Sequence, residues 1–269
     1  MLTQANDFRT ECDNLYTLLK DLSDSDFEHE TQFKGWTLND VLEHLHIWNW
    51  AAHESLVNEE SFSAYIAKIM APDMQTLSLK ERERQFFDGE KGQVLLTKWR
   101  DFYQNTADAF LQADPKARLK WAGPDMSARS SITARLMETW AHGQEVYDSL
   151  GKTRIDGDHI KNIVVLGVNT YNWTYATRKE QPLGPVPYVE VTAPSGEVWA
   201  FGDASEINYV KGEATHFCQV VTQVRHIADT SLEVLGDIAI DWMSKAQCFA
   251  GSPETPPAPG SRFSQKVRN

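Results

Sequence analysis

Two residues with metal-binding side chains stand four apart in ETWAHGQEVYDSLG, which covers residues 138–151. If this stretch is a helix, the carboxylate of Glu138 and the imidazole of His142 project from one face, one turn apart. Both groups are ligands of a borderline metal ion such as zinc. The pair alone is a weak signal, because glutamate and histidine also occur at this spacing on ordinary helix surfaces.

A third ligand would have to come from another element, and VLEHLHIWNW, residues 41–50, offers two histidines. His44 lies beside the apolar stripe of the predicted helix, and His46 lies on the other flank of that stripe. Helical phase does not choose between them. The other histidines are expected to be structural or exposed, and they are His29, His53, His159, His216 and His226.

The apolar residues recur at helical spacing over most of the first part of the chain. This periodicity predicts helices over residues 2–21, from Thr37 onward with Asp40 in a capping box, and over 92–112, 131–150 and 158–178. Residues 60–90 are expected to form shorter helical pieces broken at Pro72. The simplest arrangement is an up-down helical bundle, a fold that builds metal sites from facing helices.

The pattern changes after KEQPLGPVP, residues 179–187, which is typical of a linker. YVEVTA and EVWAF alternate around the turn PSG and predict a β-hairpin, followed by two helices. We therefore expect a helical domain over 1–180, a small α/β domain over 186–250 and a disordered, Pro/Ser-rich tail over 251–269.

The composition excludes several classes of protein. A net charge of -12 disfavours binding to nucleic acid and to anionic membranes. No segment is long and apolar enough to span a bilayer, and the N-terminus does not resemble a secretory signal. Cys12, Cys218 and Cys248 are scattered, without a CxxC motif, as expected for reduced thiols in the cytoplasm.

Three separated motifs resemble one family. GWTLNDVLEHL, residues 35–45, is similar to the second-helix motif of the DinB-like metal-binding superfamily, in particular its mycothiol-dependent maleylpyruvate isomerase branch. ETWAHGQEVYDSLG resembles the second motif of that branch. VTAPSGEVWAFGD and the residues from Gly212 to Gly251 resemble its C-terminal domain of sterol-carrier type. The resemblance implies a mainly α, DinB-like four-helix bundle followed by a small α/β domain.

The resemblance also implies a ligand set and a chemistry. It selects His44, with Glu138 and His142, as ligands of a divalent metal ion, commonly zinc. Three protein ligands leave a position open, as in catalytic zinc sites. A low-molecular-weight thiol, mycothiol or glutathione, would occupy that position as a thiolate and attack a small substrate in an isomerase or S-transferase reaction.

Residues for the substrate are less clearly marked. Arg225, followed by His226, is a candidate for binding a substrate carboxylate. The alternative is that Arg225 faces solvent at the end of a helix. Arg135 either supports the metal ligands or lies on the surface. Trp36, Trp140 and Trp173 either line the substrate pocket or pack in the core, and we favour packing in the core.

Three functions therefore compete. The first is a metal-dependent, thiol-using isomerase or transferase acting on a small, carboxylate-bearing molecule. The second is a metal-dependent hydrolase in which water takes the place of the thiol. The third is a non-catalytic binder whose second domain holds an apolar ligand.

Overall fold

A computed structural model describes residues 1–262 of the chain. The chain divides into two compact units, with the first ending at Ser149 and the second beginning at Leu150. This division falls ahead of the proline-rich stretch at 179–187, where the sequence predicts the linker. None of the helices in residues 1–262 combines the length and the apolar character needed to cross a membrane.

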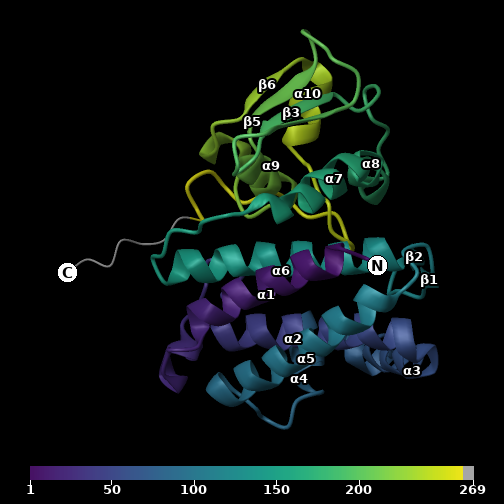
Figure 1. The fold of residues 1–269 in the computed structure, drawn as a ribbon, viewed down its shortest axis with the longest axis vertical. Helices are drawn as coiled ribbons and strands as arrows, with labels where there is room; N and C mark the ends of the chain where they lie inside the picture. Colours follow the sequence, from purple (N-terminus) through teal and green to yellow (C-terminus); the bar gives the residue numbers. More distant parts are fainter. Residues whose placement is uncertain (263–269) are drawn as a thin grey trace. The chain divides into compact units, whose positions relative to one another are not determined.

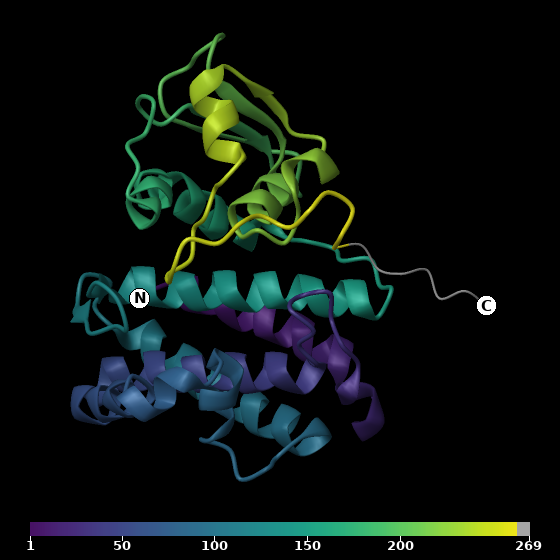
Figure 2. The same ribbon diagram turned by 180° about the vertical axis from the view of Figure 1, so that it is seen from behind.

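Four long helices form the first unit (Figure 1): α1 (Gln4–Leu19), α2 (Leu38–Val57), α5 (Gly92–Gln112) and α6 (Ala128–Ser149). Helices α1 and α2 each pack against both α5 and α6. The four helices therefore form a bundle in which α1 and α2 occupy opposite corners. Figure 2 shows the same arrangement from behind, with α1 running alongside α6. The predicted helical bundle is confirmed.

Large apolar side chains at helical spacing fill the centre of the bundle. The fully buried ones include Phe8, Leu15, Leu42, Leu45, Trp99, Leu136 and Trp140. Helix α2 begins with the predicted capping box. The Thr37 amide donates to Asp40 Oδ2 at 3.0 Å, and the Asp40 amide donates to Thr37 Oγ1 at 3.1 Å.

Short elements connect these helices. They are η1 (Asp24–Glu28), α3 (Glu59–Ile69), η2 (Pro72–Thr76), α4 (Leu79–Arg84) and an antiparallel pair, β1 (Arg118–Leu119) with β2 (Met126–Ser127). Pro72 begins η2, as expected for a residue that breaks the helical pattern. Helix α4 packs against α2 and brings acidic and basic side chains to that helix.

The second unit contains a four-stranded sheet in the order β4-β3-β5-β6. Its strands are β3 (Tyr188–Thr192), β4 (Val198–Phe201), β5 (Tyr209–Glu213) and β6 (Glu233–Leu235). Strand β3 pairs antiparallel with β4 and parallel with β5. The predicted hairpin is present, with Val191 opposite Trp199 and Gly196 in the turn at a φ of 89°. The α/β character of this part is therefore confirmed.

Helices η3 (Asp158–Ile160), α7 (Lys161–Asn169), α8 (Tyr171–Arg178), α9 (Ala214–Val221), η4 (Ile227–Asp229) and α10 (Asp237–Met243) complete the second unit. The sequence predicts one helix over 158–178, but the helix is interrupted at Thr170, whose hydroxyl donates to the carbonyl of Leu166 at 2.7 Å. Both α7 and α8 pack within this unit. A Cβ on Gly167 of α7 would approach Phe217 and Val221 of α9 to 2.9 Å, and Tyr175 of α8 donates to Asp241 at 2.8 Å.

The stretch predicted as a tail, residues 251–269, is described as far as Arg262. Within that part, Arg178 Nη2 donates to the carbonyl of Glu254 at 2.6 Å, and the amide of Gly260 donates to Asp229 at 2.9 Å. Residues 251–262 are therefore hydrogen-bonded to the second unit. Residues 263–269 lie outside the described residues.

Candidate metal centre

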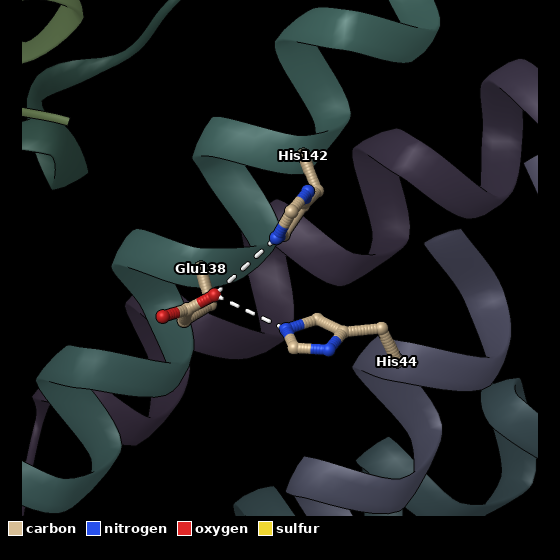
Figure 3. Close-up of side chains that lie close together, drawn as sticks. All are labelled: His44, Glu138 and His142. Carbon is tan, nitrogen blue, oxygen red and sulfur yellow. Dashed lines mark hydrogen bonds and ion pairs between the residues drawn. The ribbon is translucent and has the colours of Figure 1, made fainter. Parts of the chain in front are cut away.

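The side chains of His44, Glu138 and His142 converge between α2 and α6 (Figure 3). Glu138 Oε2 lies 3.4 Å from His44 Nε2 and 3.4 Å from His142 Nε2. One ligand atom from each residue falls within 4.8 Å of the other two. Two imidazole nitrogens and one carboxylate oxygen at this separation form a donor set that fits a divalent metal ion such as zinc.

Each candidate ligand is placed by the regular geometry of its helix. Glu138 and His142 are one turn apart on α6, so their side chains point to the same side. His44 faces them from the second turn of α2, whose start is fixed by the Thr37 capping box. Because α2 and α6 pack directly against each other, the three side chains meet across that contact.

Aromatic rings enclose the two histidines. His44 is 7% exposed and His142 is 9% exposed. The ring of Trp36 stacks on His142 with centroids 5.5 Å apart, and it meets His44 edge-on at 5.2 Å. Phe33 packs edge-on against His142 at 5.1 Å. Trp36 is buried, as the sequence predicts, but it packs on the candidate ligands themselves.

Glu83 on α4 supports His44 from behind, and sequence reasoning missed this residue. His44 Nδ1 lies 3.0 Å and 3.1 Å from the two oxygens of Glu83, and Trp48 Nε1 donates to the same carboxylate at 2.6 Å. Metal-binding histidines commonly donate their second ring N–H to such a carboxylate, which fixes the tautomer and the ring orientation. The Glu83 contact is the arrangement expected of a histidine whose Nε2 binds a metal ion.

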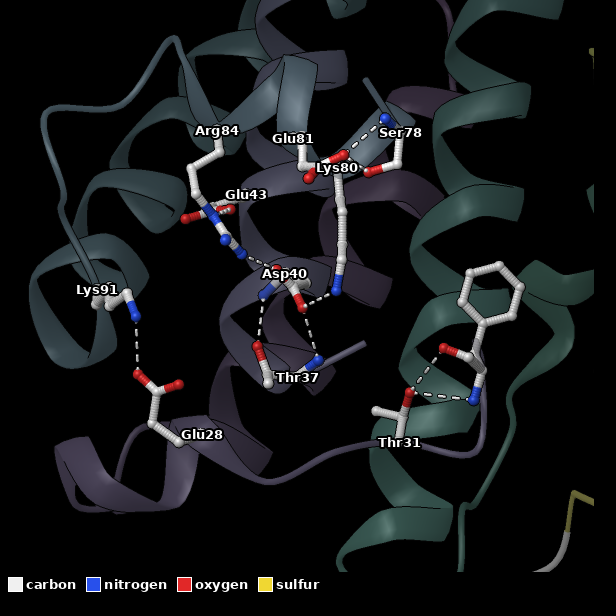
Figure 4. A network of polar contacts seen from close by, with 11 residues as sticks. Glu28, Thr31, Thr37, Asp40, Glu43, Ser78, Lys80, Glu81, Arg84 and Lys91 are labelled. Atoms are coloured by element: carbon white, nitrogen blue, oxygen red, sulfur yellow. Dashed lines mark hydrogen bonds and ion pairs between the residues drawn. The ribbon is translucent and has the colours of Figure 1, made fainter. Parts of the chain in front are cut away.

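Ion pairs hold α4, and thereby Glu83, against α2 (Figure 4). Arg84 pairs with Asp40 and, at 3.3 Å, with Glu43, while Lys80 lies 3.4 Å from Asp40. A capping box between Ser78 and Glu81 begins the helix. Nothing in the string LKERER distinguishes Glu83 from its charged neighbours, so the pairing of α4 with α2 was needed to identify it.

The pKa values of the three clustered side chains are shifted by burial and by one another. Burial of the His44 imidazole opposes protonation, but the adjacent carboxylates of Glu83 and Glu138 outweigh it and raise the pKa of His44 to about 9. Burial lowers the pKa of His142 below its ordinary value. Burial opposes ionisation of Glu138, yet hydrogen bonds from His142 and His44 hold its pKa well below the usual range. The site therefore favours a carboxylate that is ionised at neutral pH.

Two other residues singled out from the sequence, His46 and Arg225, do not join the three candidate ligands. His46 packs against Phe87 and Phe102, at centroid distances of 5.7 Å and 5.5 Å, and does not join the cluster. Arg225 belongs to the second unit, is 5% exposed, and donates to the carbonyl of Val224 at 2.9 Å. It does not face solvent, and its role toward a substrate stays a prediction.

Trp140 and Trp173 are packed or hydrogen-bonded within the protein. Trp140 is fully buried, and Trp173 Nε1 donates to the carbonyl of Phe249 at 3.0 Å. The three cysteines, Cys12, Cys218 and Cys248, are buried, and none of them forms a disulfide. Burial raises the pKa of the Cys12 and Cys218 thiols well above the usual value, so neither is suited to act as a nucleophile.

The fold and the converging ligands define a two-unit protein whose helical bundle carries a candidate metal centre. A family model described as the mycothiol maleylpyruvate isomerase N-terminal domain matches residues 8–147, and the chain belongs to this family. That match includes His44, Glu138 and His142 and spans most of the helical unit.

Comparisons over the whole chain agree with this assignment. Two uncharacterized proteins, from two strains of Mycobacterium tuberculosis, are each 32% identical over 247 residues, which covers 92% of this chain and 95% of theirs. The crystal structure of the mycothiol-dependent maleylpyruvate isomerase has a TM-score of 0.56 at 13% identity, covering 82% of this chain and 88% of that one. A mutant of that enzyme gives a TM-score of 0.53 at 14% identity with the same coverage. These solved structures share the fold of this chain.

Proposed function

We propose that this protein is a metal-dependent enzyme that acts on a small, carboxylate-bearing molecule with the help of a low-molecular-weight thiol. The thiol either catalyses isomerisation of this molecule or is transferred to it. The observation that carries the proposal is the convergence of His44, Glu138 and His142, with His44 held from behind by Glu83. A structural homologue is described as mycothiol-dependent, which supports mycothiol or a similar thiol as the cosubstrate.

The three side chains would hold one divalent metal ion, with zinc the expected choice for two imidazoles and a carboxylate. Such an ion lowers the pKa of a thiol bound to it and keeps the thiol ionised near neutral pH. The residues of the chain prepare the site for this role. Glu83 accepts the Nδ1 proton of His44, so that Nε2 faces Glu138, and Trp36 and Phe33 shield His142 from water.

The thiol must come from outside the protein. The cysteines of the chain are buried, and none belongs to the cluster of His44, Glu138 and His142. Cysteines that form no disulfide also favour a reducing, cytoplasmic location for the reaction. Arg225 remains our sequence-based candidate for contacting a substrate carboxylate, and the second domain remains our candidate for a fold of sterol-carrier type.

Cobalt substitution tests the use of a thiol directly. A thiolate bound to cobalt gives an intense sulfur-to-metal charge-transfer band, whereas water does not. Adding glutathione or mycothiol to the cobalt-loaded protein should produce this band, and His142→Ala should abolish it. If the spectrum does not respond to any thiol and the protein hydrolyses amides without one, the hydrolase alternative replaces this proposal.

A further inference from the structure

A row of polar residues continues along α6 beyond the metal ligands. Ser131, Arg135, Glu138 and His142 follow one another at spacings of four, three and four residues, so they lie on one face of the helix. Arg135 is one turn from Glu138, about 4.5 Å along the helix axis. The face that carries the candidate ligands therefore also carries a guanidinium group.

Arg135 is a buried cation that forms no ion pair with a described residue, although the carboxylates of Glu138 and Glu83 act on its charge from farther away. It is 2% exposed, and its Nε donates to Asn49 Oδ1 at 3.0 Å, a neutral acceptor. Its Nη2 is buried and has no hydrogen-bond partner. A guanidinium remains charged in proteins, and leaving one of its buried N–H groups without an acceptor is costly. An anion from outside the chain would remove that cost.

The groups around Arg135 add further hydrogen-bond donors. Asn49 Nδ2, Ser131 Oγ and the Tyr65 hydroxyl are all buried and have no hydrogen-bond partner. Ser131 is one turn before Arg135 on α6. Tyr65 packs on Trp48 and Trp50, the two residues that flank Asn49, at centroid distances of 6.1 Å and 5.3 Å. Asn49 on α2, Tyr65 on α3 and Ser131 on α6 therefore each carry an unpaired donor near Arg135.

We propose that Arg135 and Asn49 form a binding site for a carboxylate of the small-molecule substrate, one helical turn from the metal ligands. A guanidinium binds a carboxylate through two parallel N–H···O bonds, and the free amide of Asn49 adds a third donor. The inference rests on the proposed function, because it names the part of the substrate that this site recognises. It also places carboxylate recognition within the helical unit, on residues other than Arg225.

Calorimetric titration of the metal-loaded protein tests the proposal with two probes of similar size, succinate, which carries two carboxylates, and succinamide, which carries none. Succinate should bind the wild-type protein more tightly than succinamide does. Arg135→Met should weaken succinate binding about 10- to 100-fold and reduce the preference for succinate by the same factor, because a charge-assisted pair is lost. Arg135→Lys, which keeps the charge without the planar fork, should fall between them.

Two further variants complete the design. Arg100→Met removes an exposed guanidinium that stacks on Tyr16 at 4.8 Å, and it should leave the affinity for succinate unchanged. Arg225→Met tests the competing arginine. Equal succinate affinity in the wild type and in Arg135→Met would overturn the proposal and leave water as the partner of these donors. Loss of the succinate preference in Arg225→Met alone would also overturn it.

The stability of the variants separates a binding role from a structural one. Arg135→Met removes the unpaired Nη2 donor together with the hydrogen bond to Asn49, so the melting temperature of the ligand-free protein should change little. A lower melting temperature, with both probes weakened equally, would make Arg135 structural and refute the proposal. The cobalt–thiolate band should persist in Arg135→Met, so a missing band in the wild type counts against the proposed function and not against this site.

Discussion

Replacing Glu83 with glutamine should weaken metal binding about tenfold. In the wild-type protein the Glu83 carboxylate lies 3.0 Å from His44 Nδ1 and also accepts from Trp48 Nε1. Glutamine keeps one oxygen that can accept from either donor, but it loses the negative charge. A hydrogen bond to a charged group contributes about 1.5–3 kcal/mol and a neutral one about 0.5–1.5 kcal/mol, and a difference near 1.4 kcal/mol is tenfold in affinity. Glu83→Ala, which leaves both donors without a partner, should cost about 100-fold.

The pH of the assay decides how clearly this effect is seen. In the metal-free protein the pKa of His44 is about 9, so at pH 7 a metal ion must displace a proton from it. Metal affinity should therefore rise with pH by up to about tenfold per unit until pH 9, and then level off. Removing the Glu83 carboxylate lowers the pKa of His44 and reduces this competition. The loss in Glu83→Gln should thus be smaller at pH 7 than at pH 9.

A chromophoric chelator that competes for zinc provides the assay, at pH 7 and at pH 9. Glu54→Gln is the matched control, because Glu54 is a carboxylate on α2 that contacts a histidine outside the centre, His53, at 3.2 Å. The control should bind zinc as tightly as the wild type. The reasoning is refuted if Glu83→Gln keeps wild-type affinity at pH 9, or if Glu54→Gln loses as much.

Two other predictions test the cysteines and the division of the chain. In the native protein Cys12, Cys218 and Cys248 should react with a thiol reagent at least about 100-fold more slowly than in denaturant, because all three are buried. Replacing all three with serine should leave thiol-dependent activity largely intact. Rapid labelling of the native protein would contradict this prediction. A fragment of residues 1–149 should give a helical circular dichroism spectrum and bind zinc. A fragment of residues 150–262 should unfold cooperatively, whereas a fragment of residues 181–262, which lacks α7 and α8, should not. Equal cooperativity in the two C-terminal fragments would show that those helices are dispensable.

Much of the fold could be predicted because local periodicity was strong. The long helices of the bundle show apolar residues at helical spacing, and the β3–β4 hairpin shows alternation around a turn at Gly196. The division between the units was harder to predict. A run of prolines marks a break in helical structure, but α7 and α8 precede that run and pack against α9 and Asp241, contacts that no local pattern reveals.

The residues of the candidate site could likewise be predicted from the sequence only in part. Glu138 and His142 could be paired from sequence because one helix carries both, whereas choosing His44 over His46 required the resemblance to a family. The structure places His44 Nε2 beside Glu138 and His46 against Phe87 and Phe102. The contacts of Glu83 with His44 and of Asn49 with Arg135 could not be predicted, since each arises from packing between helices far apart in the chain.

Metal content in single-alanine variants tests the central claim most directly. Wild-type protein, loaded with zinc and freed of excess, should hold about one ion per chain by elemental analysis. His44→Ala, Glu138→Ala and His142→Ala should each lose the ion, while His46→Ala should retain it. The account is contradicted if His44→Ala keeps full occupancy and His46→Ala loses it, or if all four variants keep the metal.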